Sequence, residues 1–224
     1  AKAVAAARSI LGEEGVRRGG LVQAHGTGTP QNRTSESEIL SRTAEAFGIQ
    51  DWPVAAIKCY LGHSLGSASG DQFNATLGIW SHSIIPGIDT IEQLAEDVRR
   101  DRLDFALRHR ALEPEEQQYA IINSKGFGGN NASATLLSPS VTTRMLQARY
   151  SDQEWTAWQR ANEDVQARQQ AYDDDMVLGT REPVYKFDHG VLLDGDVELG
   201  AGRMLVGGKV VDLDFESPYP DMQI

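Results

Sequence analysis

The sequence predicts an α/β layered domain that is followed by a helix and a β-hairpin tail. Apolar runs alternate with helical patterns, which is typical of strands joined by crossover helices, at residues 21–26, 53–62, 118–124 and 132–138. The first two runs are continuously apolar, as expected for strands of a sheet covered on both faces. After about residue 140 the pattern changes, so we expect one domain over residues 1–140 and an extension over 141–224.

The helices of the first domain follow from spacing and capping signals. Residues 2–15 are rich in alanine and place Val4, Ile10 and Leu11 on one face. A second helix is expected to begin at a Thr34 or Ser35 cap, with Glu38 completing a capping box, and to run to Phe47. A third, rich in small residues, is expected over 64–83.

The extension predicts one long polar helix over residues 142–176, followed by β-hairpins over 181–216. Turns are expected at Asp194–Gly195 and at Gly207–Gly208, since both pairs suit hairpin connections. Residues 142–224 carry −8 of the chain's net charge of −11. Nothing in them clusters like a catalytic site, so structural support is the expected role.

The bulk properties exclude several classes of protein. No region of the 224-residue chain is basic enough to suggest nucleic-acid binding, and no apolar run is long enough to span a bilayer. One cysteine, Cys59, rules out a disulfide within the chain and favours a reducing, cytoplasmic compartment. Because the first residues lack both Met and a signal-peptide pattern, we expect a fragment or a processed product.

Three polar clusters lie beside the apolar strands: HGTGTP at 25–30, KCYLGHSLG at 58–66 and NSKGFGGNN at 123–131. Each alone has an ordinary structural interpretation, such as a tight turn or a locally hydrogen-bonded histidine. In a layered α/β domain, however, all three are expected at one edge of the sheet, where ligands bind. Two neutral histidines there would donate hydrogen bonds to a thioester oxygen that gains negative charge.

The order of these motifs, HGTGT, then Lys-x3-Gly-His, then NS-x-GFGG-x-N, resembles the C-terminal half of the β-ketoacyl synthases over roughly residues 1–138. The resemblance implies half of a thiolase-like αβαβα fold. It also implies a homodimer and, with the C-terminal extension, an atypical bacterial branch implicated in starting fatty acid synthesis from acetyl-CoA and malonyl carrier protein.

The resemblance further implies the roles of individual residues. By position, His25 and His63 hold the malonyl thioester carbonyl, Lys58 is the family lysine, and Glu36 is its salt-bridge partner. Thr27 and Thr29 match the threonines that bind the phosphopantetheine arm. Phe127 matches the gating phenylalanine, and Gly128 follows it in the substrate-binding loop.

Some features depart from the family pattern. The nucleophilic cysteine of the family belongs to the N-terminal half of the fold, and Cys59 beside Lys58 in an expected strand reads as a small buried residue instead. We therefore expect the chain alone to be inactive. Asn32–Arg33 replace the usual Gly-Asp, and Lys125 replaces the usual Phe.

The expected reaction is a decarboxylative Claisen condensation of an acyl thioester, from acyl-CoA or acyl carrier protein, with malonyl carrier protein. No metal and no resident cofactor are expected, because the phosphopantetheine arm arrives on the carrier protein. The expected partners are that carrier protein, the N-terminal half and a second copy of the enzyme. Alternatives are a catalytically silent chain-length-factor-like subunit and an acyl-binding scaffold; thiolase-type cleavage is weaker, because GFGGNN has no cysteine.

Overall fold

The computed structural model describes residues 1–217, and the chain divides into two compact units, Ala1–Trp155 and Thr156–Ile224. Each unit is described by itself. The boundary expected near residue 140 stays a prediction. Within residues 1–217 every helix is too short or too polar to cross a bilayer.

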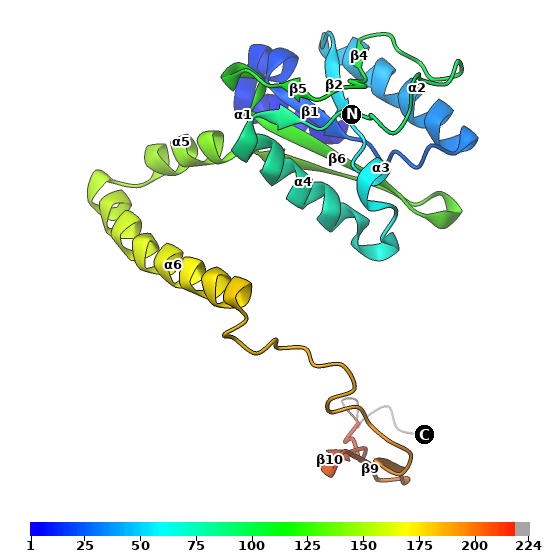
Figure 1. Cartoon of the computed structure of the whole chain (residues 1–224), viewed down its shortest axis with the longest axis vertical. Coiled ribbons are helices and arrows are strands. Elements are labelled where there is room, and N and C mark those ends of the chain that lie inside the picture. The colour runs from blue at the N-terminus through cyan, green and yellow to red at the C-terminus, as the bar shows by residue number, and fades with distance from the viewer. Residues whose placement is uncertain (218–224) are drawn as a thin grey trace. The chain divides into compact units, whose positions relative to one another are not determined.

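The first unit is an α/β layered domain (Figure 1). Its helices are α1 (Lys2–Arg18), α2 (Pro30–Phe47), α3 (Lys58–Leu61), α4 (Ala68–His82) and α5 (Pro139–Arg149). Its strands are β1 (Gly20–Gln23), β2 (Trp52–Ala55), β3 (Ile84–Ile85), β4 (Leu103–Asp104), β5 (Arg110–Ala111), β6 (Tyr119–Lys125) and β7 (Asn131–Leu137). Short 3-10 turns add η1 (Leu65–Ser67), η2 (Pro114–Glu116) and η3 (Phe127–Gly129).

The main sheet has the strand order β4-β2-β1-β6-β7. The pairs β4–β2, β2–β1 and β1–β6 are parallel, and β7 runs antiparallel to β6. A separate two-stranded ladder joins β3 and β5. The mixed sheet confirms the predicted fold class. It also brings the carboxyl ends of β1, β2 and β6 to one edge.

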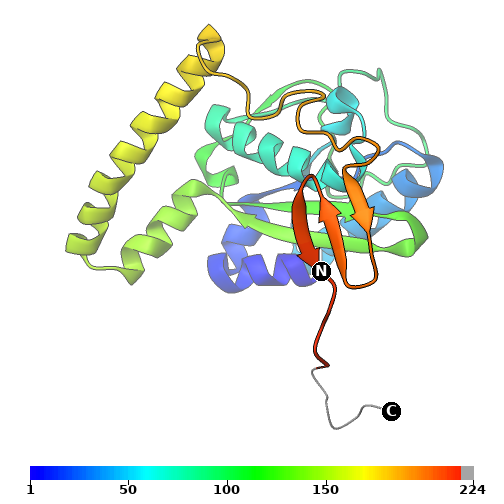
Figure 2. The ribbon, with the colours of Figure 1, turned by 90° about the horizontal axis from the view of Figure 1, so that it is seen from below.

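Helices cover the main sheet on both faces. Figure 2 shows α4 on one face of the sheet and α1 on the other. Consecutive strand residues divide between two cores: Val22 packs with residues of α1 and α2, whereas Leu21 packs with Ile79 of α4. This burial of both strand faces explains why the strands read as continuous apolar runs.

Two predicted boundaries in this unit are wrong. The strand expected over 53–62 ends at Ala55, and Lys58 begins the short helix α3, which Gly62 ends with φ +73°. The second helix begins at Pro30 behind Thr29 rather than at Ser35, because proline suits the first helical position. The hydroxyl of Ser35 bonds back to the carbonyl of Gln31 instead of capping.

The long helix predicted for the extension is two helices, α5 and α6 (Asp152–Leu178). Tyr150 is extended, with φ −109° and ψ 152°, and ends α5. Ser151 and Glu154 then form a reciprocal capping box: the Ser151 amide donates to the Glu154 carboxylate at 2.9 Å, and the Glu154 amide donates to the Ser151 hydroxyl at 3.4 Å. The S-x-x-E signature at this break is therefore a helix start.

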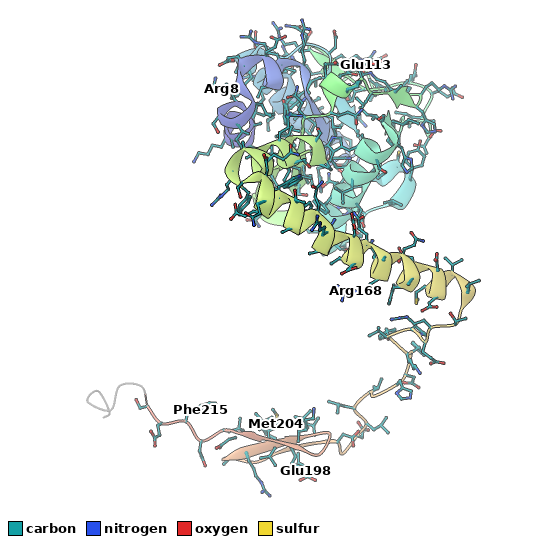
Figure 3. All side chains as sticks on the ribbon, turned by 90° about the vertical axis from the view of Figure 1, so that its left-hand side faces the viewer. Arg8, Glu113, Arg168, Glu198, Met204 and Phe215 are labelled. Carbon is teal, nitrogen blue, oxygen red and sulfur yellow. The ribbon has the colours of Figure 1, made fainter. Side chains whose placement is uncertain are left out.

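The second unit contains a three-stranded antiparallel sheet of β8 (Val197–Leu199), β9 (Arg203–Val206) and β10 (Lys209–Asp212). The turn expected at Gly207–Gly208 is confirmed, since both glycines have positive φ and join β9 to β10. Asp194–Gly195 precedes β8 rather than joining two strands. Figure 3 shows the side chains along this sheet, with Glu198 and Met204 labelled.

Candidate active site

The three polar clusters of the sequence meet at one edge of the main sheet. His25 lies two residues beyond the end of β1, and His63 follows α3, which comes after β2. Lys125 ends β6 and leads into η3. Because β1, β2 and β6 are parallel, their carboxyl ends carry these side chains to the same place.

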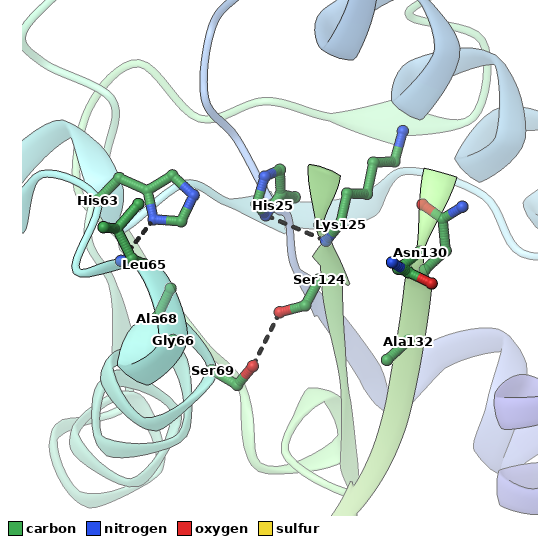
Figure 4. A pocket seen from close by; sticks show the side chains of 12 residues that line it. His25, His63, Leu65, Gly66, Ala68, Ser69, Ser124, Lys125, Asn130 and Ala132 are labelled. Carbon is green, nitrogen blue, oxygen red and sulfur yellow. Dashed lines mark hydrogen bonds between the residues drawn. The ribbon is translucent and has the colours of Figure 1, made fainter. Parts of the chain in front are cut away.

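The imidazole rings of His25 and His63 lie side by side, with ring centroids 5.2 Å apart and an edge-on angle of 81°. Figure 4 shows both rings at the wall of one pocket. His25 is buried and His63 is exposed. The two histidines that the sequence predicts at one edge are therefore brought together.

Main-chain amides orient both rings. The Lys125 amide donates to His25 Nδ1 at 3.3 Å, and the Leu65 amide donates to His63 Nδ1 at 3.1 Å (Figure 4). A ring nitrogen that accepts a hydrogen bond carries no proton, so the proton of each neutral imidazole is on Nε2. Both rings then present an Nε2–H donor.

The surroundings of His25 favour its neutral form. Burial lowers the pKa of His25 below its ordinary value of 6.5, and the nearby ammonium of Lys58 lowers it further. The Glu36 carboxylate opposes this shift, while His63 and Lys125 add to it. His25 is therefore a neutral donor at physiological pH.

Glu36 holds the loop that carries His25. Glu36 is 4% exposed, and its carboxylate accepts hydrogen bonds from the main-chain amides of His25 at 2.8 Å and Gly26 at 3.0 Å. The side-chain amides of Asn32 and Asn123 donate to the same carboxylate. These four donors satisfy a buried negative charge, which would otherwise be costly.

The salt bridge expected between Lys58 and Glu36 does not form. Lys58 Nζ is buried and has no hydrogen-bond partner among residues 1–217, because the four amide donors occupy the Glu36 oxygens. Burial lowers the pKa of the Lys58 ammonium, and the charges of Glu36 and Asp71 oppose the shift. The lysine thus stands as an unpaired cation.

Cys59 lies on α3 beside Lys58, so its expected place in a strand is wrong. The thiol is half-buried, and burial raises its pKa. A raised pKa keeps the thiol protonated, and only a thiolate is a good nucleophile. Cys59 is therefore unsuited to covalent catalysis.

Two cavities open beside the histidines. The smaller, ≈ 300 Å³, is lined by both histidines, Ser69, Ser124 and Lys125 (Figure 4). The larger, ≈ 1420 Å³, also reaches both histidines and has Thr27 and Thr29 on its wall. Drug-sized ligands typically occupy cavities of about 300–1,000 Å³, so the larger one has room for an extended arm.

The remaining predicted site residues differ in their placement. Lys58, Glu36 and Phe127 line the larger cavity, and the Phe127 side chain is 92% exposed at its rim. Gly128 lines neither cavity, and its φ of +74° shapes the η3 turn. Its role in substrate binding stays a prediction.

Sequence reasoning missed two polar residues that organise the site. Gln72 of α4 is fully buried, and its amide donates to the carbonyls of Gln23 at 3.1 Å, Ala24 at 2.7 Å and Asn123 at 3.2 Å. It ties the ends of β1 and β6 to α4. Asn123 lies inside the NSKGFGGNN motif, so the motif could have pointed to it. Gln72 lies in a helix rich in small residues, and no motif marked it as a site residue.

Comparison with known proteins shows which proteins this chain is similar to. Residues 1–91 match the family model described as the β-ketoacyl synthase C-terminal domain. The chain is 43% identical over 208 residues to β-ketoacyl-[acyl-carrier-protein] synthase FabY of Pseudomonas aeruginosa, covering 93% of this chain and 33% of that protein. It is 31% identical over 114 residues to 3-oxoacyl-[acyl-carrier-protein] synthase 2 of Vibrio cholerae, covering 51% of this chain and 27% of that protein.

The crystal structure of the noncanonical ketosynthase FabY from P. aeruginosa matches with a TM-score of 0.79 and 40% identity, over 100% of this chain and 35% of that one. The chain spans about one third of the length of these relatives. The likeness to FabY includes the extension, whereas the V. cholerae match stops at half of the chain. Residues 1–91 therefore carry a β-ketoacyl synthase C-terminal domain, and the similarity to FabY continues through the residues that follow it.

Proposed function

We propose that this chain supplies the decarboxylation half of a β-ketoacyl-[acyl-carrier-protein] synthase. In the reaction, the bond between the carboxylate and the α-carbon of a malonyl thioester breaks and carbon dioxide leaves. The electron pair passes to the α-carbon and, as an enolate, to the thioester oxygen. The α-carbon then attacks an acyl thioester carbonyl, a new C–C bond forms, and the thiolate leaves.

The observation that carries this proposal is the pair of Nε2–H donors on His25 and His63. Enolate formation places negative charge on a single oxygen, and two fixed neutral donors stabilise that charge without themselves reorganising. The main-chain amides that hold both Nδ1 atoms keep the donors in the required tautomer. The unpaired Lys58 ammonium adds positive potential to the same cavity.

The larger cavity supports a carrier-protein substrate. Thr27 and Thr29 hydroxyls on its wall lie 3.3 Å apart and can bond the amides of a phosphopantetheine arm. Phe127, which lines the same cavity and is exposed, would gate that arm. The substrates would be malonyl carrier protein and an acyl-CoA or acyl carrier protein, and no resident cofactor is needed.

A complementary N-terminal half is proposed to supply the nucleophilic cysteine. Helix α4 covers one face of the sheet, yet its outer side leaves Phe73 and Leu77 each 41% exposed. Residues 131–134 of β7, the edge strand of the same sheet, are also exposed. An apolar helix face of this kind fits a second α/β layer packed against it, as in a five-layer fold. A homodimer of the complete enzyme is part of the same proposal.

The test is His63→Ala in the full-length protein, with release of carbon dioxide from malonyl carrier protein as the readout. Loss of one oxyanion donor costs about 100–1,000-fold in rate, so decarboxylation should fall by that factor while acyl transfer to the cysteine stays detectable. His82→Ala, which changes an exposed histidine at the end of α4, is the matched control and should leave the rate unchanged.

Unimpaired decarboxylation by His63→Ala would refute the role of the histidine pair. A wild-type protein that binds carrier protein but never releases carbon dioxide would instead favour the silent chain-length-factor-like subunit or the acyl-binding scaffold. We favour an active enzyme over these alternatives, because both histidines, Lys58 and the buried carboxylate of Glu36 line one cavity.

A further inference from the structure

Lys125 occupies a position in the histidine pocket that the proposed chemistry leaves unused. It ends β6, and it lines both the smaller and the larger cavity. Its main-chain amide holds His25, whereas its ammonium extends to the Ser35 hydroxyl at 3.1 Å (Figure 4 shows the side chain passing the His25 ring). The orientation of the His25 ring therefore depends on the main-chain amide of Lys125 and not on the charge of the Lys125 side chain.

The charges around the larger cavity do not balance. Within the described part of the chain, its wall carries the cations of Arg33, Lys58 and Lys125 but a single carboxylate, Glu36. Arg33 is paired in a two-pronged contact with Asp97, at 2.7 and 2.9 Å. The Glu36 oxygens are taken by four amide donors. Two ammonium groups are left without a carboxylate partner.

The two unpaired ammonium groups are not equivalent. Lys58 Nζ is buried, whereas the half-buried Lys125 has a neutral hydroxyl as its hydrogen-bond partner and can rotate away from it. Among residues 1–217, the lining of the smaller cavity includes both histidines and Lys125 and no acidic residue. An anion that enters this pocket finds Lys125 on the same wall as the two histidines.

We propose that the Lys125 ammonium binds the free carboxylate of the malonyl unit and so selects a dicarboxylic thioester over a neutral one. The inference rests on the proposed function. In a malonyl thioester the carboxyl carbon is two bonds from the carbonyl carbon, so an oxygen held by the histidines places the carboxylate within the same pocket. Charge-assisted hydrogen bonds to carboxylates are short and strong, which suits a lysine with no competing acid.

The sign of the kinetic effect follows from the chemistry. The carboxylate leaves as carbon dioxide, so its contact with Lys125 exists in the bound substrate and weakens as the transition state is approached. An interaction that favours the bound substrate lowers KM without raising kcat. Removing the ammonium should therefore raise KM for the malonyl substrate and should not reduce kcat.

The experiment compares Lys125→Met with wild type in the full-length protein, using malonyl-pantetheine and malonyl-phosphopantetheine as probes. KM for carbon dioxide release should rise about tenfold on both probes, the order expected for one charge-assisted contact, with kcat unchanged or higher. Lys125→Arg keeps the charge and should restore KM. Lys2→Met, at an exposed lysine of α1, is the matched control.

Two outcomes for Lys125→Met would overturn the inference directly: a KM that does not change, or a fall in kcat at constant KM. A KM that rises for the phosphorylated probe alone would also overturn it, because the ammonium would then bind the phosphate of the arm. Calorimetric binding separates this inference from the proposed function. If wild type releases no carbon dioxide yet binds malonyl-pantetheine more tightly than acetyl-pantetheine, and Lys125→Met removes that preference, the carboxylate contact stands and the proposed function fails.

Discussion

Glu36→Gln is the sharpest test of how the active-site loop is held. The substitution keeps the shape of the side chain and replaces one carboxylate oxygen with an amide group that donates. The two donors that bonded the replaced oxygen then face the new amide group, which is itself a donor. If the new amide faces Gly26 and Asn32, Asn32 can turn its side chain, because its own Oδ1 is buried without a partner among residues 1–217. The Gly26 amide has no such option.

The expected loss of stability follows from the number of hydrogen bonds that Glu36→Gln removes. Two hydrogen bonds to a charged group are lost, each worth about 1.5–3 kcal/mol, and a turned Asn32 returns about 1 kcal/mol. The free energy of unfolding should therefore fall by about 2–5 kcal/mol. Loss of the negative charge also removes the one influence from Glu36 that raises the pKa of His25, so that pKa should fall further.

Urea unfolding followed by tryptophan fluorescence measures the effect, since Trp52 is fully buried in the core beside α2. Glu38→Gln is the matched control, two residues along the same helix. Glu38 is partly exposed in ion pairs with Arg42 and Arg99, and such pairs contribute about 0–1 kcal/mol. A Glu36→Gln variant that loses no more stability than Glu38→Gln would show that the carboxylate does not hold the loop.

Two further predictions concern His25 and α4. Because the pKa of His25 is lowered from 6.5 in the folded state, the unfolded state binds the proton of this histidine more readily. The contribution of His25 to the free energy of unfolding is therefore present above pH 6.5 and is lost as the pH falls through the folded-state pKa. The NMR titration midpoint of His25 should lie below 6.5 and should rise in Lys58→Met; a midpoint at or above 6.5 contradicts this. In the full-length protein, Phe73→Ala should cost about 3–5 kcal/mol of unfolding free energy if a second layer covers α4, and a loss below about 0.5 kcal/mol would show that the face is solvent-exposed.

The site was predictable from sequence to the extent that it depends on parallel strand ends. Each cluster follows an apolar strand, and parallel strands deliver such clusters to one edge whatever the exact strand limits. His25, His63 and Thr27 therefore lie where they were expected. The predicted end of β2 was wrong, but the inference holds, because the short helix α3 still leaves His63 at the same edge of the sheet.

Hydrogen-bond partners were less predictable, because they depend on which donors surround a group in three dimensions. Glu36 and Lys58 have opposite charges, and sequence alone makes a salt bridge the natural expectation. Two of the donors that occupy Glu36 instead are main-chain amides, which every residue carries and no motif reveals. The third and fourth come from Asn32 and Asn123, 91 positions apart in the chain.

The dependence on backbone donors bears on how the site can work. His25 Nδ1, His63 Nδ1 and the Glu36 carboxylate are all held by main-chain N–H groups, which do not change protonation state between pH 5 and 9. A histidine oriented by a carboxylate would gain basicity and would be prone to protonation. One whose Nδ1 accepts from an amide keeps its Nε2–H for the substrate in the neutral ring, so the arrangement suits an oxyanion donor better than a general base.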